Sequence, residues 1–74
     1  MTKVVYKRLR RYWGWAHIAE DKIELFKGLK GKHHLEIIIH EQFHILFPDL
    51  EERAIKHLAK KMTETLWKDG YRKI

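Results

Sequence analysis

The sequence predicts one α+β domain, residues 1–74, in which a small antiparallel β-sheet with a hairpin is followed by two α-helices. Two observations indicate this class. Residues 12–18 are rich in aromatic residues, which favour strands. Beyond Gly31, apolar residues recur at helical spacing. The chain has 74 residues and no cysteine, so a domain near the lower size limit must find a stabilising element other than a disulfide.

The β region is expected to contain one strand and a hairpin. Residues 4–10 alternate loosely between apolar and polar side chains, which indicates a first strand. Residues 13–26 predict the hairpin, because strand-favouring residues flank a polar turn at residues 19–22. Gly28 and Gly31 then end the β region. In so small a domain the aromatic residues of this region are expected to belong to the core: Tyr6, Tyr12, Trp13 and Trp15.

Two helices are expected to follow. The first covers residues 32–47 and ends before Pro48, since the residue before a proline avoids the α conformation. The second covers residues 49–68, with Gly70 at the position of a C-terminal cap. Its apolar face recurs at helical spacing and consists of Ile55, Leu58, Ala59, Met62 and Leu66.

The first predicted helix contains the pattern H-E-x-x-H at residues 40–44. Residues four apart lie one above the other on a helix, so the imidazoles of His40 and His44 can reach a single metal ion. Glu41 is rotated by roughly 100° from His40. This places Glu41 outside the metal's ligands but close enough to act as the base for a metal-activated water, as in zinc peptidases.

The sequence around this motif favours a metal over a surface pair of histidines. The flanking residues 35–39 and 45–47 are mostly apolar, which indicates a helix buried on nearly every side. Burying two imidazoles and a carboxylate without partners is costly, and one cation satisfies them together. Zinc is the expected cofactor, although manganese, iron or nickel accept the same nitrogen and oxygen ligands. The competing interpretation is a metal-free core in which His40 and His44 are only hydrogen-bonded.

A catalytic zinc ion needs a third protein ligand after His44. Glu52 is the first candidate, because a short connection can fold the first turn of the second helix against the histidines. Its competing role is structural, since Asp49 and Glu52 also fit a capping box. Glu51 is the second candidate, because it projects near the middle of the apolar stripe. His57 is the third candidate, although its position on the helix points away from this apolar stripe. A site with only the two histidines also stays open.

Several segments together resemble a known family. They are Trp13-Gly14, Lys30-Gly31-Lys32, Leu35 through His44, Pro48-Asp49-Leu50-Glu51-Glu52, Leu66-Trp67 and Gly70-Tyr71. In these segments the chain resembles minimal zincins, in particular the very short H-E-x-x-H metallopeptidases encoded by bacteriophages. The resemblance implies a gluzincin-like site in which a glutamate of the second helix completes the metal shell. It also implies a phage or bacterial cytoplasmic setting, and it implies no particular substrate.

The predicted function is therefore a zinc-dependent metallopeptidase that cleaves a peptide or protein substrate, with Glu41 as general base. The alternative is a zinc-stabilised, non-catalytic interaction module that binds nucleic acid through its basic N-terminal segment. A net charge of +6 and a pI near 9.7 are compatible with either a solvated basic surface or this alternative. We find no signal-peptide pattern and no run long enough to span a bilayer, so a cytoplasmic location without a membrane partner is expected.

Other polar residues are candidates for supporting roles. His17 could hydrogen-bond a substrate carbonyl, but a partly exposed strand histidine is the simpler interpretation. Tyr12 and Tyr71 are conceivable phenolic donors to a tetrahedral intermediate. His33 and His34 precede the buried turns of the first helix and are expected to be solvated.

Overall fold

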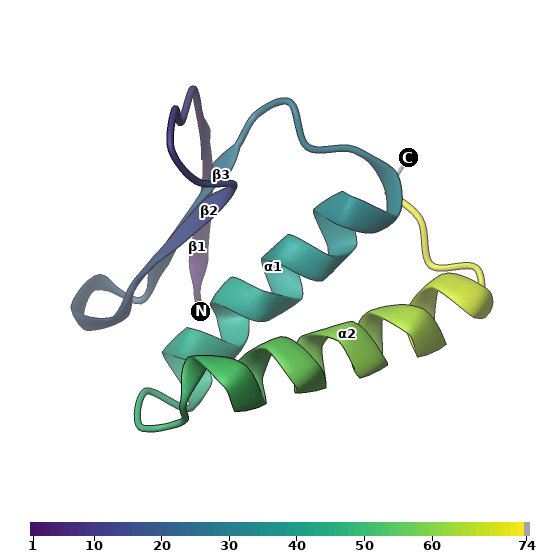
Figure 1. Cartoon of the computed structure of the whole chain (residues 1–74). Coiled ribbons are helices and arrows are strands. Elements are labelled where there is room, and N and C mark those ends of the chain that lie inside the picture. Colours follow the sequence, from purple (N-terminus) through teal and green to yellow (C-terminus); the bar gives the residue numbers. More distant parts are fainter. Residues whose placement is uncertain (74) are drawn as a thin grey trace.

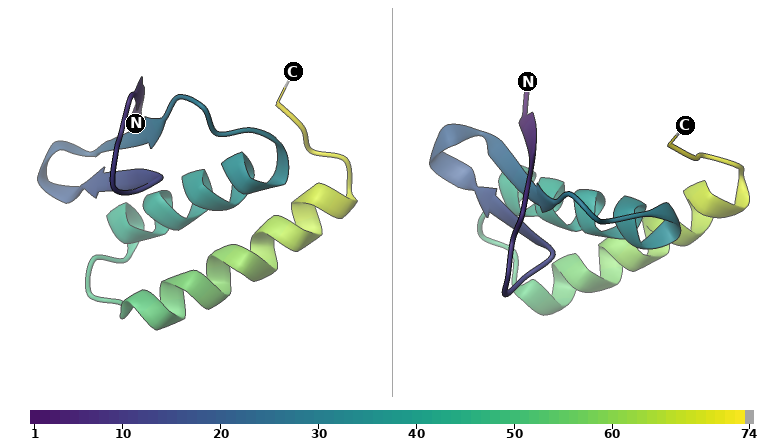
Figure 2. Two further views of the ribbon diagram at one scale, coloured as in Figure 1. Left: turned by 45° about the horizontal axis from the view of Figure 1, so that its top comes forward. Right: turned by 90° about the horizontal axis from the view of Figure 1, so that it is seen from above.

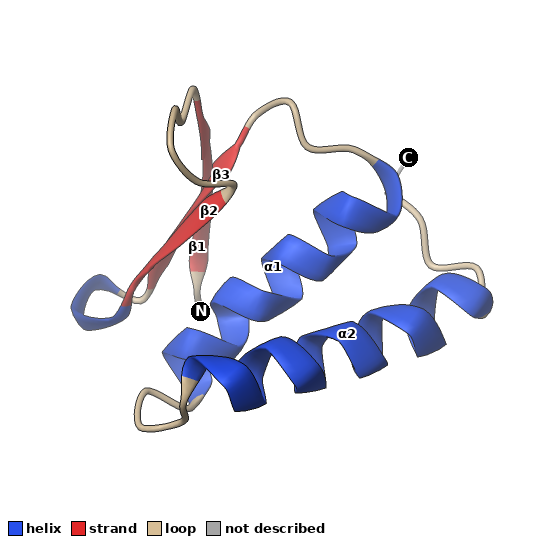
Figure 3. Ribbon diagram, in the orientation of Figure 1, coloured by secondary structure: helices blue, strands red, loops and turns tan. Residues whose placement is uncertain are grey.

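Three β-strands precede two α-helices in the computed structural model, which describes residues 1–73 (Figure 1). The elements are β1 (Lys3–Lys7), β2 (Gly14–His17), the short 3₁₀ helix η1 (Ile18–Glu20), β3 (Lys22–Phe26), α1 (Gly31–Leu46) and α2 (Glu52–Lys68). Figure 3 shows that strands and helices occupy separate parts of the chain, with η1 at the tip of the hairpin. The predicted α+β class is confirmed.

The sheet has the strand order β1-β3-β2 and is mixed rather than purely antiparallel. β2 and β3 form the predicted antiparallel hairpin. β1 pairs with β3 in parallel, with Lys3 opposite Lys22 and Lys7 opposite Phe26. The chain crosses from β1 to the far edge of the sheet before it forms the hairpin, so β3 takes the central position. β1 ends at Lys7, three residues before the expected end of the first strand.

α1 lies between the sheet and α2, and it contacts β2 and β3 on one side and α2 on the other (Figures 1 and 2). The two helices run in opposite directions and are joined by residues 47–51. The segment after α2 turns back toward the start of α1, where Lys73 Nζ lies 3.2 Å from the Tyr6 hydroxyl. This layering places the C-terminal half of α1 between β2 and the start of α2.

The fully buried side chains come from β3 and α2. They are Ile23 and Leu25 on the strand, and Ile55, Ala59 and Thr63 on the helix. The apolar face predicted for α2 is correct for Ile55 and Ala59. It is wrong for Leu58 and Met62, which are 42% and 45% exposed. Thr63 takes a core position instead, because its hydroxyl donates a hydrogen bond to the Ala59 carbonyl at 2.6 Å and so is not left without a partner.

The prediction that the N-terminal aromatic residues form the core is wrong. Tyr6, Tyr12, Trp13 and Trp15 are 40%, 46%, 52% and 50% exposed. The helices cover only one face of the sheet, and Trp15 lies opposite the outward-facing Glu24 in the register of β2 and β3. Tyr12 and Trp13 belong to the irregular segment between β1 and β2.

α1 is less buried than its apolar sequence suggested. None of its residues is fully buried, and those from His34 to Ile45 are half-buried. The helix presents its sides to the sheet and to α2, and the remaining surface faces solvent. Among the described residues, neither helix combines the length and the apolar character that crossing a bilayer requires.

Gly14 allows β2 to approach α1 closely. A Cβ atom at this position would lie 3.0 Å from Glu41 Cγ, from Ile37 Cγ2 and from Leu25 Cδ2, which is tighter than ordinary packing contacts. Glycine is needed here for space rather than for an unusual backbone angle. The absence of a side chain at Gly14 thus brings the start of β2 directly over Glu41.

Candidate metal centre

Two histidine side chains lie next to each other in the C-terminal half of α1. The ring centroids of His40 and His44 are 5.0 Å apart, and their Nε2 atoms are 3.2 Å apart. Their side chains are 16% and 25% exposed, so both rings are largely shielded but reachable from solvent. The four-residue spacing therefore brings the two nitrogens to one point, as expected from the sequence.

Glu52 completes a three-residue cluster with these histidines. Its Oε1 lies 2.6 Å from His40 Nε2, and its Oε2 lies 2.8 Å from His44 Nε2. Glu52 is the first residue of α2, and the chain reversal after α1 carries it back to the histidines. One ligand atom from each of the three residues lies within 4.8 Å of the others, so the group could hold a metal ion.

The competing capping role of Glu52 is not observed. α2 begins three residues later than expected, and Glu51 rather than Asp49 occupies the N-cap position, without a side-chain capping bond. The cause is a turn after α1, closed by a hydrogen bond from the Leu50 N–H to the Phe47 carbonyl at 3.1 Å. Glu51 and His57, the other two candidate ligands, are both outside the cluster.

The spacing of the donor atoms is compatible with a tetrahedral zinc ion. Ligand atoms about 2.0–2.1 Å from zinc lie roughly 3.3 Å from one another. The separation of 3.2 Å between the two Nε2 atoms is close to this value. The Glu52 oxygens, at 2.6 and 2.8 Å from the nitrogens, need to withdraw by about 0.5–0.7 Å. Because Glu52 is 63% exposed, its side chain has the freedom to do so.

Glu41 lies in the same pocket as the cluster. The pocket has a volume of about 400 Å³ and is lined by Tyr12, Gly14, Trp15, Ala16, Ile18, His40, Glu41, His44 and Glu52. Burial raises the pKa of the Glu41 carboxyl, and the charge of Glu52 adds to this effect. Positive charge on His40 and His44, and the backbone of Ala16, act in the opposite direction.

The pocket has acidic groups but no lysine or arginine in its lining. Ionised Glu41 and Glu52 bring a formal charge of −2 to this lining. A divalent cation would offset this charge, and it would replace the direct contacts between Glu52 and the histidines. The chemistry of the donor set therefore fits a metal ion.

The remaining sequence candidates have different positions. Tyr12 lines the pocket, whereas Tyr71 lies at the other end of the helical pair. His17 is on the outer face of the sheet and does not line the pocket. His33 is exposed, as expected, but packs its ring against Trp13 at 4.9 Å. His34 is half-buried rather than solvated, and its Nε2 is 2.9 Å from the Tyr6 hydroxyl.

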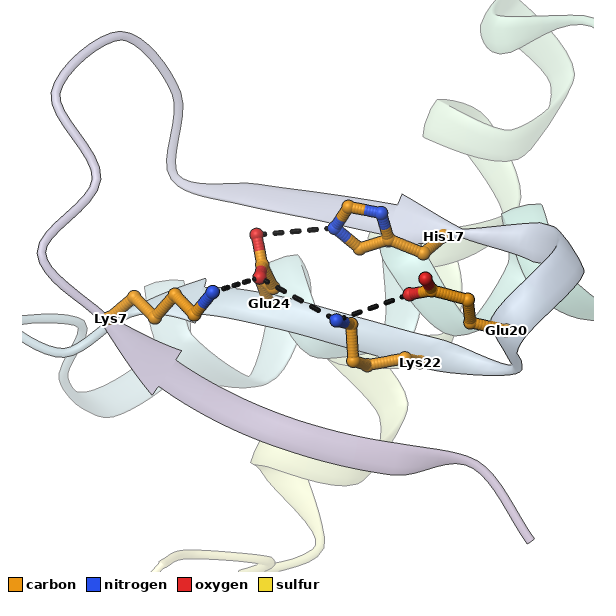
Figure 4. A network of polar contacts seen from close by, with 5 residues as sticks. All are labelled: Lys7, His17, Glu20, Lys22 and Glu24. Atoms are coloured by element: carbon orange, nitrogen blue, oxygen red, sulfur yellow. Dashed lines mark ion pairs between the residues drawn. The ribbon is translucent and has the colours of Figure 1, made fainter.

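A second cluster of histidine and carboxylate groups, not anticipated from the sequence, lies on the outer face of the sheet (Figure 4). The buried Glu24 carboxylate pairs with Lys7, lies 3.1 Å from His17 Nε2 and lies 3.9 Å from Lys22 Nζ. The His17 nitrogen is at ion-pairing distance without good hydrogen-bond geometry. Lys7, followed by His17, holds the pKa of Glu24 below its ordinary value. The sequence feature that could have indicated this cluster is Glu24, which lies between the apolar residues Ile23 and Leu25 in β3.

No protein-family model matches this chain, and comparisons with curated proteins and with solved structures found no similar protein. The resemblance to minimal zincins therefore stays a prediction.

Proposed function

We propose that this protein is a zinc-dependent metallopeptidase in which His40, His44 and Glu52 hold the metal and Glu41 is the general base. The observation that supports this proposal is the convergence of the three donor groups in one pocket. The same pocket also contains the carboxyl group of Glu41, which is not one of the three. Zinc suits two imidazoles and one carboxylate in a shell that leaves one position open. When bound, the metal would polarise the scissile carbonyl and make water more acidic.

The residues around the metal have separate tasks in this mechanism. Glu41 takes a proton from the attacking water and delivers it to the leaving amine. Its burial in the pocket raises its pKa and so makes the carboxylate a better base than an exposed glutamate. The hydroxyl of Tyr12, a residue that lines the same pocket, is the proposed donor to the developing oxyanion.

β2 is the proposed platform for an extended peptide. It is an outer strand of the sheet, and its residues Gly14, Trp15 and Ala16 line the pocket. An extended chain that pairs with such an edge obtains main-chain hydrogen bonds without depending on particular side chains. The substrate class is therefore a flexible peptide segment, and with a pocket this open we expect weak side-chain preference.

The experiment compares zinc-loaded wild-type protein with Glu41→Gln on a mixed peptide library, followed by mass spectrometry. We expect cleavage by the wild type, and a loss of about 10²- to 10⁴-fold in the variant with zinc binding unchanged. Glu51→Gln is the matched control, because it removes a neighbouring carboxylate outside the cluster and should retain activity. Equal cleavage by wild type and Glu41→Gln would contradict the assignment.

A non-catalytic role for the same metal is the second candidate. It is favoured by the position of the cluster, which joins the C-terminal half of α1 to the first residue of α2 in a chain without cysteine. Metal binding then contributes directly to folding free energy. In this case zinc should raise the melting temperature, while neither wild type nor Glu41→Gln cleaves any peptide.

A further inference from the structure

We propose that the segment between β1 and β2, together with Trp15, is a binding surface for single-stranded nucleic acid. This stacking surface consists of Arg8, Arg10, Arg11, Tyr12, Trp13 and Trp15. It shares Tyr12 and Trp15 with the lining of the pocket at His40, His44 and Glu52, but it does not depend on the proposed peptidase activity.

The first observation is the exposure of three aromatic rings in neighbouring positions. Tyr12, Trp13 and Trp15 are each about half exposed. Leaving such large apolar area in water is unfavourable, and contiguous exposed aromatic groups mark interaction sites. Because the residues are not needed to fill the core, their aromatic character requires another explanation.

The second observation is that these rings are held in place by neighbours. Trp13 packs edge-on against Phe26 at 5.6 Å and against His33 at 4.9 Å. Tyr12 and Trp15 pack edge-on against each other at 5.5 Å. Ring faces that are already ordered lose little conformational entropy when a planar group stacks on them.

The third observation is uncompensated positive charge on the same segment. Residues 1–19 contain five lysine and arginine residues and no aspartate or glutamate. Within residues 1–73, Arg8, Arg10 and Arg11 are exposed and take part in no ion pair. Arg10 and Arg11 line a pocket of about 350 Å³ with Leu9, Tyr12, Trp13 and Phe26.

Exposed arginines beside exposed aromatic rings indicate single-stranded nucleic acid as the partner. Phosphates of a nucleic acid pair with arginine side chains, and unpaired bases stack on aromatic faces. The base faces of a duplex are stacked inside it, so a duplex could contact the arginines through its phosphates but could not stack on the aromatic rings. Acidic peptides and anionic lipid surfaces also satisfy the arginines, but neither supplies a regular series of planar groups for three rings.

The test measures binding of a fluorescent oligothymidylate of about 12 nucleotides by anisotropy, over salt concentrations from about 50 to 200 mM. We expect binding that weakens steeply with salt and is accompanied by quenching of tryptophan fluorescence. The Arg10→Gln, Arg11→Gln double variant should bind more weakly. The slope of log K against log salt should fall by about 1.4 if each arginine contacts one phosphate. The matched control, Lys60→Gln with Lys61→Gln on α2, removes two exposed charges elsewhere and should change the slope little.

The aromatic contribution needs its own variants. Trp13→Leu should weaken binding roughly 5- to 150-fold, the range expected from losing one stacked base. Trp13→Phe should restore much of the affinity, and circular dichroism establishes that both variants fold. Glu41→Gln should bind the oligonucleotide as the wild type does, so this test is independent of catalysis.

Four results would overturn the proposal. They are no binding at low salt, equal loss of affinity in the two double variants, no effect of Trp13→Leu in a folded protein, and equal or tighter binding to a duplex, to polyglutamate or to vesicles of anionic lipid. The last result would identify the surface as a general site for polyanions.

Discussion

The outer face of the sheet and the candidate metal centre both place carboxylates beside histidines, but they balance the charge in different ways. On the sheet, Glu24 is neutralised by the protein's own cations, chiefly Lys7, with His17 and Lys22 nearby. The pocket between β2 and α1 holds Glu41 and Glu52, and its described lining includes the imidazoles of His40 and His44 but no lysine or arginine. The pKa of Glu24 is lowered, whereas that of Glu41 is raised. The sheet cluster is complete by itself, whereas the pocket could take a cation from outside.

The largest expected effect comes from removing a ligand. At a zinc concentration about one hundred times its dissociation constant, wild-type protein should gain ~2.7 kcal/mol of stability, which a chelator removes. His44→Ala should lose this gain, because two remaining ligands hold zinc far more weakly. Thermal unfolding with and without zinc measures the difference. His57→Ala, an exposed histidine of α2, is the control and should respond to zinc as the wild type does. Equal responses from both variants would mean that the pocket needs no external cation.

A smaller effect is expected from filling the space between β2 and α1. Gly14→Val places atoms against Glu41, Ile37 and Leu25, and overpacking of this kind typically costs about 1–3 kcal/mol. Urea unfolding of the zinc-free protein measures the loss. Ala19→Val, at an exposed position in η1, adds a similar side chain and should be nearly neutral. If Gly14→Val unfolds at the same urea concentration as wild type, the close approach of β2 to Glu41 is incorrect.

The smallest effect concerns the sheet cluster. The pKa of Glu24 is lower in the folded protein than in the unfolded chain, so ionised Glu24 contributes stability at pH values above the ordinary glutamate pKa. This stability should be lost as the pH falls through the lowered folded pKa. Glu24→Gln should lack that part of the pH dependence in urea unfolding. The contribution is modest because Lys7 is half exposed and solvent screens the pair. Glu64→Gln, on the exposed side of α2, should retain the wild-type profile.

Local patterns in the sequence were sufficient for the hairpin, for both helices and for the convergence of His40, His44 and Glu52. Each depends on short-range geometry: the four-residue spacing on α1, the turn between β2 and β3, and the short link that returns Glu52 to α1. The predicted start of α2 at residue 49 is three residues too early, because the hydrogen bond from Leu50 to Phe47 closes a turn before the helix begins. Because of this shift, Glu52 lies beside His40 and His44 and does not form a capping box with Asp49.

Features set by long-range packing could not be predicted in this way. The parallel pairing of β1 with β3 depends on which strand occupies the centre of the sheet. The exposure of Trp13 and Trp15 depends on the helices covering only one sheet face, which residue hydrophobicity does not encode. Thr63 can be buried because its hydroxyl donates a hydrogen bond to the Ala59 carbonyl. It lies on the same side of α2 as Ile55 and Ala59, whereas Met62 is exposed.

Tyr12 lines both the pocket at the metal centre and the pocket beside Arg10 and Arg11. Two ligands that favour different orientations of one shared side chain would be thermodynamically linked. If an oligonucleotide that reorients Tyr12 alters the dissociation constant of a peptide by some factor, the peptide must alter that of the oligonucleotide by the same factor. A single phenol ring would thereby make two chemically unrelated ligands mutual effectors, competitive or cooperative according to the orientation that each one prefers.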